Sequence, residues 1–222
     1  MISRVYARLL QHTHDASKLP CRRGWERDLG PIDGETWELC LTSAPLVSVS
    51  ASQRLSHLYL LHRVYRTPAR LHKWGFRDTP LCPKCTAQNG DQLHMMWKCP
   101  KLFRYWKFVL DTIAQVFQIP VLTDPMVCLL GALELPDLSP NGHTAVLRLL
   151  YLARKEIAKL WITPRVPTGA QWVKQANSIL IREKLTYQHR GALKKFYSMW
   201  QPWLDVPGLG PLQLVRDRLL QG

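Results

Sequence analysis

The sequence predicts a mainly α-helical protein. Apolar residues recur every three to four positions along several segments, which is the spacing of one helix face, and no segment shows the strict alternation of a strand. Three cysteines and one histidine lie within eighteen residues in the order C-x2-C-x8-H-x4-C (Cys82, Cys85, His94 and Cys99). We therefore expect helical domains pinned by one small Cys3His zinc loop.

Proline, glycine and charge patterns divide the chain into five regions. Turn-forming residues interrupt the helical pattern, and the charge changes sign along the chain. The regions are a loose basic leader (1–24), a helical region (25–119) that contains the zinc-binding segment (about 62–107), a connecting segment (120–143), a C-terminal basic helical region (144–204) and a tail (205–222) that should fray.

Three helical segments are expected before the metal motif. Residues 25–42 should form a short helical or mixed segment, and residues 51–66 carry an apolar stripe at helical spacing. Thr67 and Pro68 are typical of an N-cap followed by proline in the first turn. A short helix over 68–74 should therefore follow.

Four helices are expected after the motif. Pro100 opens a segment with a strong apolar stripe that runs to about residue 118, and Pro120 stops it. Residues 126–135 are apolar, and their type is left open, with a buried helix as one reading. The C-terminal region should hold three helices, at 144–161, 170–187 and 190–200.

The spacing of the cysteines and the histidine favours a structural zinc site. The C-P-K-C sequence at 82–85 suits a tight turn because proline presets φ, and backbone N–H groups after Cys82 can then donate to its thiolate. Four protein ligands leave no position for water, so the single Zn²⁺ should be structural. An iron–sulfur cluster and an empty site are the alternatives. His62 and His72 fit better as helix-surface residues than as ligands.

The chain is strongly basic, with 30 Lys and Arg residues against 16 Asp and Glu residues and a net charge of +14. Residues 54–107 and 148–195 each carry eleven basic and two acidic residues, so each block has a charge of +9. The metal motif lies in the first block, where Lys84 and Lys98 could offset the negative charge of three thiolates on Zn²⁺. Two such blocks favour a polyanionic partner, RNA or DNA, over ordinary solvated helix faces.

Basic and aromatic residues around the motif are candidates for nucleic-acid contacts. Met95, Met96 and Trp97 could stack on bases, but packing against the following helix to seal the metal is the favoured interpretation. Sequence-tolerant contacts to backbone phosphates are expected from eight residues: Arg63, Arg66, Arg70, Lys73, Lys98, Lys101, Arg104 and Lys107.

The motifs of several enzyme classes are missing. The chain has no P-loop, no G-x-S-x-G, no H-E-x-x-H and no G-x-G-x-x-G. Acidic residues are too sparse for a two-metal site, and no Glu stands beside His94 as a zinc deaminase would need. We therefore expect no catalytic residue, no enzymatic activity of the chain on its own and no small-molecule substrate.

Cysteine usage and hydropathy predict the compartment. Six cysteines are too few and too clustered for a disulfide scaffold, and the N-terminus lacks the apolar stretch of a signal peptide. No run of about 18 apolar residues exists, so no membrane association is expected. These features predict an intracellular protein of the cytoplasm or nucleus that is not secreted.

The segment from His62 to Trp106 resembles the cysteine-rich region downstream of the polymerase core in non-LTR (LINE-type) retrotransposon reverse transcriptases. The shared pattern is H-R-x-Y-x-T-P-x-R-L, then C-x2-C, then H-x-x-W-x-C-P, then an aromatic-rich helix. Further similarity extends it to about residues 25–204, through GWERDLGPIDGETWELC upstream and LLGAL, LYLARKEIAKLWITPRVPTGAQWV and EKLTYQHRGALKKFYSMWQPWL downstream.

The resemblance implies a zinc-binding C-terminal fragment that helps to hold element RNA or target DNA. The polymerase core and endonuclease of that family would lie N-terminal to this segment, so the fragment should have neither activity, and the core of a parent element is a possible partner. The alternative is a protein-interaction module or a non-functional transposon remnant. Such an orphan interface should show as an exposed apolar patch.

Overall fold

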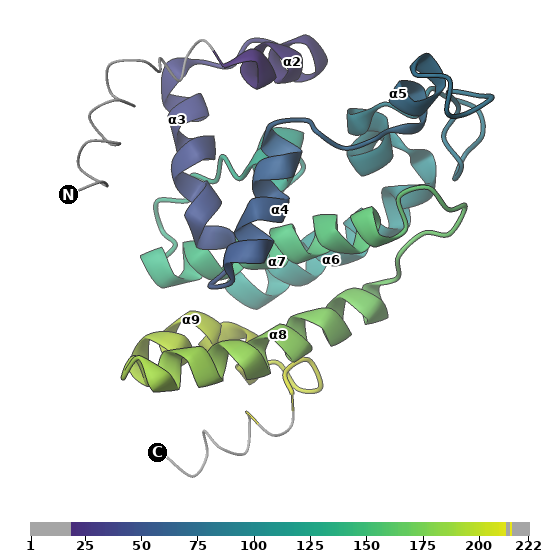
Figure 1. Cartoon of the computed structure of the whole chain (residues 1–222). Helices are drawn as coiled ribbons and strands as arrows, with labels where there is room; N and C mark the ends of the chain where they lie inside the picture. The colour runs from purple at the N-terminus through teal and green to yellow at the C-terminus, as the bar shows by residue number, and fades with distance from the viewer. Residues whose placement is uncertain (1–18, 212–213, 215–222) are drawn as a thin grey trace.

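The structure, a computed structural model, describes residues 19–211 and residue 214 (Figure 1). Within this part of the chain no strand forms, and an isolated antiparallel bridge joins Leu81 to Asn89. The prediction of a mainly α-helical protein is confirmed. The α-helices are α2 (Pro20–Leu29), α3 (Gly34–Ser43), α4 (Ala51–Leu61), α5 (Pro68–Lys73), α6 (Phe103–Phe117), α7 (Pro140–Lys159), α8 (Gly169–His189) and α9 (Leu193–Asp205). The shorter turns are η2 (Ala44–Val47), η3 (His94–Lys98), η4 (Pro100–Leu102) and η5 (Met126–Leu130).

Helix α7 lies at the centre of the fold. It packs against α6, α8, α9 and η2, and Figure 1 shows α8 and α9 paired on one side of it and α4 on the other. Every residue from 145 to 154 is buried, so this helix is enclosed around its whole circumference. A helix buried on all sides must find partners for its polar side chains. Two arginines, Arg148 and Arg154, are thereby placed inside the protein.

The two helical regions expected on either side of the connecting segment share one hydrophobic core. Helix α6 packs against α7, α8 and α9. The connecting segment itself contributes η5, one π-helical turn in which Cys128, Leu129 and Leu130 are buried. This turn is the only helical structure within residues 126–135, so the possible longer helix there does not form.

The N-terminal boundaries differ from the expected ones. Helix α2 begins at Pro20, so residues 20–24 are not a loose leader, and residues 1–18 lie outside the described part. The reason is Trp25, which is fully buried and donates its Nε1–H to the Leu61 carbonyl oxygen at 2.9 Å. A proline in the first turn then starts the helix one turn before this anchor. The mixed segment 25–42 becomes two helices, because Asp33 caps α3 by accepting from the Thr36 N–H at 2.8 Å.

The helix expected over 51–66 ends five residues early, at Leu61. Arg63 adopts a left-handed conformation (φ 56°), which cannot continue an α-helix. Its side chain lies over the Trp25 ring, 4.5 Å from the ring centroid, and pairs with Asp28. These long-range contacts with α2 explain the early end.

The other helices begin near proline or polar caps. Thr67 caps α5 as expected, since its hydroxyl accepts from the Arg70 N–H at 3.2 Å. Ser139 caps α7 four residues earlier than expected, and Thr168 forms a capping box with Gln171 at the start of α8. Helix α9 continues through Pro202 to Asp205, five residues beyond its expected end. The first residues of the tail contact α8, because the Asn177 side chain donates to the Leu209 carbonyl oxygen at 2.8 Å.

Candidate metal centre

Cys82, Cys85, His94 and Cys99 form one compact cluster. One possible ligand atom from each residue lies within 4.8 Å of the other three. The Cys82 and Cys99 sulfurs are 3.8 Å apart, and the Cys85 sulfur is 3.3 Å from His94 Nε2. A tetrahedron with metal–sulfur bonds of about 2.3 Å has sulfur–sulfur edges of about 3.8 Å. The cluster could therefore hold one metal ion.

The first two ligands lie on a tight turn, as the sequence predicts. The backbone N–H of Lys84 points to the Cys82 sulfur at 3.4 Å, and Thr86 N–H donates to the Cys82 carbonyl oxygen at 2.9 Å. Thr86 takes the left-handed conformation (φ 57°) that closes the turn. The Ala87 and Gln88 N–H groups donate to the Cys85 sulfur. Backbone donors thus surround both sulfurs and would stabilise thiolates.

His94 and Cys99 lie at the two ends of one π-helical turn. Asp91 starts this turn by accepting from the His94 N–H at 2.8 Å, and the Cys99 N–H donates to the His94 carbonyl oxygen at 2.9 Å. A five-residue hydrogen-bonded turn brings residues i and i+5 close together. The x4 spacing between the last two ligands follows from this geometry, where a helical turn of unspecified type was expected.

Burial, hydrogen bonds and neighbouring groups together shift the pKa values of the cluster residues when no metal is bound. Burial, opposed by the Lys101 N–H and reinforced by the neighbouring thiols, raises the pKa of Cys99 to about 12. Burial raises the pKa of Cys85, but the backbone donors and the neighbouring thiols outweigh it, so this pKa is lowered. Burial, opposed by Asp91, lowers the pKa of His94. At neutral pH the imidazole is therefore ready to bind, whereas the Cys99 thiol keeps its proton.

Metal binding is accordingly expected to release protons and to strengthen as the pH rises. Coordination needs the Cys99 thiolate, so each proton released should make the affinity increase about tenfold per pH unit between pH 6 and 8. Calorimetric titration with Zn²⁺ in two buffers of different ionisation enthalpy measures the protons released. An affinity that does not change with pH would contradict this protonation scheme.

Lys84 ties the metal loop to the end of α7. Only 6% of Lys84 is exposed, and its ammonium donates to the carbonyl oxygens of Leu160 at 2.7 Å and Thr163 at 3.1 Å. Burial lowers the pKa of this lysine, and the sulfurs of Cys82 and Cys99 oppose that shift. Lys84 is therefore close enough to interact electrostatically with the sulfurs of Cys82 and Cys99, which the predicted charge-balancing role requires. Its second role, satisfying carbonyls after a helix C-terminus, has no signal in the sequence.

The residues between His94 and Cys99 seal the cluster. Met95 and Met96 are completely buried, and the Trp97 ring packs against the Trp106 ring with centroids 5.0 Å apart. Trp106 also donates its Nε1–H to the Met96 carbonyl oxygen at 2.8 Å. The favoured packing interpretation thus fits the structure, and the two methionines are closed to base stacking. His62 and His72 are exposed and lie outside the cluster, as expected.

The eight basic residues predicted to contact phosphates separate into three groups. Arg63 pairs with Asp28, and Arg70 donates to the Arg63 and Tyr65 carbonyl oxygens, so these two arginines are bound inside the protein and leave the candidate set. Lys107 is exposed but pairs with Asp111 at 2.8 Å. Five exposed residues remain free of ion pairs to any described residue: Arg66, Lys73, Lys98, Lys101 and Arg104.

Sequence reasoning missed three exposed aromatic residues beside these cations. Trp74 and Phe76 follow α5, and Phe103 begins α6, with exposed fractions of 51%, 79% and 68%. Their positions in segments rich in Lys and Arg were a signal that could have identified them. The other three cysteines lie outside the cluster and are buried (Cys21, Cys40 and Cys128).

Among the described helices none is both long enough and apolar enough to cross a membrane. No protein-family model matches the chain.

Proposed function

We propose that this protein is a zinc-binding module that holds RNA or DNA through backbone phosphates and has no polymerase or endonuclease activity of its own. The observation that carries the proposal is the position of Lys98 and Lys101, exposed on either side of the buried ligand Cys99. Arg104 follows one turn later on α6. A bound metal would hold the segment that carries these three cations in one conformation.

Zinc is the metal that we propose for the cluster. Three sulfurs and one imidazole nitrogen at tetrahedral separations are a common structural zinc set, and four protein ligands leave no position for a substrate. The backbone N–H groups around the sulfurs and the burial of three of the four ligands support a structural ion.

Exposed aromatic rings support binding to single strands. Trp74, Phe76 and Phe103 present ring surface to solvent near Lys73, Lys101 and Arg104 in the sequence. Bases can stack on such rings at about 1–3 kcal/mol per base, while the cations contact phosphates. This combination tolerates any base sequence, in RNA or in DNA.

We further propose that the chain corresponds to the C-terminal zinc-binding region of a LINE-type reverse transcriptase, and that it acts inside the cell. Its support is the sequence pattern quoted from His62 to Trp106. The T-P pair starts α5, the four metal-binding residues meet, and the aromatic-rich stretch forms α6. The polymerase core of a parent element is then a candidate partner.

Salt dependence tests the nucleic-acid proposal. The triple variant Lys98→Ala/Lys101→Ala/Arg104→Ala should bind single-stranded RNA more weakly, and the slope of log affinity against log salt should fall by about two units, at roughly 0.7 per lost phosphate contact. Fluorescence anisotropy of a labelled oligonucleotide, recorded at salt concentrations from about 50 to about 200 mM, measures the affinity and the slope.

The matched control is Lys174→Ala/Lys194→Ala/Lys195→Ala, which removes the same charge from exposed positions on α8 and α9. Because these lysines lie in the second basic block, their loss should lower the slope less than the loss of Lys98, Lys101 and Arg104 does. An equal loss in both triples would mean that only net charge matters, and a wild-type slope near zero would refute nucleic-acid binding.

One observation favours the alternative of a protein-interaction module. An apolar groove of about 340 Å³ lies beside α6, lined by Trp97, Phe103, Trp106, Leu110 and Val121 among others. In that case the apolar helix of a partner protein would occupy it. The Phe103→Ser variant separates the two functions: it should abolish binding to such a partner, while RNA binding falls only by the contribution of one stacking ring.

A further inference from the structure

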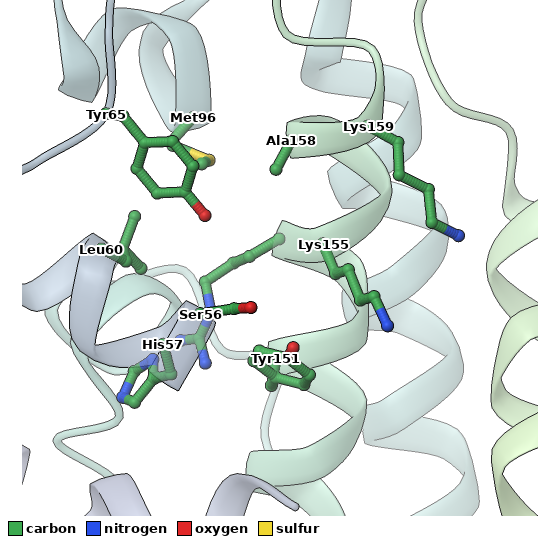
Figure 2. Close-up of a pocket in the computed structure, with 10 residues that line it drawn as sticks. Ser56, His57, Leu60, Tyr65, Met96, Tyr151, Lys155, Ala158 and Lys159 are labelled. Atoms are coloured by element: carbon green, nitrogen blue, oxygen red, sulfur yellow. The ribbon is translucent and has the colours of Figure 1, made fainter. Parts of the chain in front are cut away.

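A cavity of about 240 Å³ lies between α4 and α7, and none of the four metal-binding residues lines it. Figure 2 shows Ser56 and His57 from α4 on one wall and Tyr151 from α7 on the other, with Tyr65 and Met96 above them. Leu60 and Ala158 add apolar surface. The cavity therefore combines polar groups at one end with an apolar wall, which is the usual composition of a small-ligand site.

Arg154 lines this cavity and is only 3% exposed. Its Nη1 donates to the carbonyl oxygens of Cys128 at 2.9 Å and Leu129 at 2.7 Å, so the η5 turn fixes the orientation of the guanidinium. Its Nε and Nη2 are buried and have no hydrogen-bond partner among the described residues. These two nitrogens form the edge of the guanidinium that binds two oxygens of a carboxylate or phosphate side by side.

His57 presents a second buried polar group without a partner. It is 1% exposed, and neither ring nitrogen has a hydrogen-bond partner among the described residues. Burial, reinforced by Arg154, holds the pKa of His57 well below its usual value, so the ring is neutral and can donate one hydrogen bond. Its ring meets the Tyr151 ring edge-on, with centroids 6.4 Å apart.

The charge around the cavity is positive. Burial lowers the pKa of Arg154 only to about 10, so this arginine is charged at neutral pH. No described carboxylate pairs with it: Glu156, the next acid along α7, pairs with Lys159. Lys155 adds a second cation to the lining. A buried charge without a counter-charge is costly, and an anion in the cavity would remove that cost.

From this arrangement we propose that the cavity binds a phosphate monoester, with two phosphoryl oxygens on the Nε–Nη2 edge of Arg154 and a third accepting from His57. The hydroxyl of Tyr151 is a further donor, and the organic part would lie against Leu60 and Met96. The volume is larger than a carboxylate needs and admits a small phosphorylated molecule or the terminal residue of a strand. This inference does not depend on the proposed nucleic-acid function.

Calorimetric titration of the zinc-loaded full chain tests the inference. Phenyl phosphate should bind at one saturable site, and benzoate, which offers the same ring with a carboxylate, at least about tenfold more weakly. Arg154→Lys keeps the charge but loses the two-oxygen edge, so phenyl phosphate should bind about ten- to a hundredfold more weakly, which corresponds to a charge-assisted pair of about 1.5–3 kcal/mol.

A second variant separates lost binding from misfolding. His57→Phe keeps the ring packing against Tyr151 and removes two unpartnered buried nitrogens, so it should fold at least as stably and still bind several-fold more weakly. The control Arg190→Lys, at an exposed position after α8, should bind as the wild type does. Melting curves and zinc content verify that each variant is folded.

Two oligonucleotides distinguish the sources of the phosphate. If 5′-phosphorylated tetrauridylate competes with phenyl phosphate and its 5′-hydroxyl form does not, the ligand is a strand end; if neither competes, it is a free small phosphate. The Lys98, Lys101 and Arg104 triple variant should bind phenyl phosphate normally, which separates this site from the proposed RNA surface. The inference is overturned if no phosphate saturates, if benzoate binds more tightly, or if both Arg154→Lys and His57→Phe bind as the wild type does.

Discussion

Replacing Cys85 with serine is expected to release the metal and to lower the melting temperature of the metal-loaded protein by about 8–16 °C. An ion present at about a thousand times its dissociation constant stabilises the folded state by about 4 kcal/mol. In a chain of this size each kcal/mol corresponds to about 2–4 °C. Cys85 is the appropriate ligand to replace because it is partly exposed, so the serine hydroxyl meets solvent.

The loss should be greatest around the metal loop. Residues 79–93 contain an isolated bridge, a few turns and two helical residues at their end, whereas the residues from His94 to Cys99 continue through η4 into α6. Without the ion, the loop stays attached through the contact of Lys84 with the end of α7 and through the Ala69 N–H, which donates to the Gly90 carbonyl oxygen at 3.3 Å. Hydrogen exchange should therefore accelerate in residues 79–93 first and leave the centre of α7 protected.

The zinc content and the melting temperature are measured, by metal analysis and calorimetry, for the wild type and two variants. The wild type should carry one equivalent of zinc, Cys85→Ser should carry much less, and the control Cys21→Ser should keep the full equivalent, because Cys21 lies outside the cluster. A Cys85→Ser protein that retained one equivalent would refute the four-ligand site.

The metal cluster could be predicted from the sequence because its signals are local. The C-P-K-C turn needs only its own backbone, and Asp91 starts the turn that carries His94 and Cys99. The cap of α5 is similar, since Thr67 and Pro68 are adjacent in the sequence. Where a few neighbouring residues determine a structure by themselves, their identities are enough to predict it.

The remaining features depend on contacts between residues far apart in the chain. The sequence predicts a solvated cation at Arg63. Its contact with the Trp25 ring and its ion pair with Asp28, both far away in the sequence, explain why α4 ends just before it. Arg154 lies in a helix expected from its apolar stripe, yet nothing in the local pattern reveals that this helix is enclosed on all sides. Burial on both faces of a helix is a tertiary property, so the cavity at Arg154 could not be predicted from periodicity.

Glu183→Ala is expected to destabilise the protein by about 3–5 kcal/mol, because it removes one member of a buried ion pair and leaves the other charged. Glu183 is 1% exposed, and its carboxylate accepts from Arg148 Nη1 at 2.5 Å and from Trp200 Nε1 at 3.2 Å. Arg148 also donates to the Leu46 carbonyl oxygen and contacts the Tyr187 hydroxyl. One pair thus connects α7, α8, α9 and η2, and urea titration at pH 7 measures its loss.

The double variant Arg148→Met/Glu183→Leu is the control that separates charge from packing. Replacing both partners with apolar side chains removes the unpaired charge, so most of the lost stability should return. A double variant as unstable as Glu183→Ala would mean that the hydrogen bonds, and not the buried charge, hold these helices together.

The single variant Arg148→Met should make stability depend on pH in a defined direction. Burial, opposed by Arg148 and Trp200, already raises the pKa of Glu183 in the folded protein. Without the arginine this pKa rises further, so the folded state holds a proton that the unfolded state releases. Stability should then be highest below the unfolded pKa of about 4.3 and decline as the pH rises towards the folded pKa. If the variant instead gained stability with rising pH in this range, Glu183 would have to be ionised and solvated, and its burial between α7, α8 and α9 would be wrong.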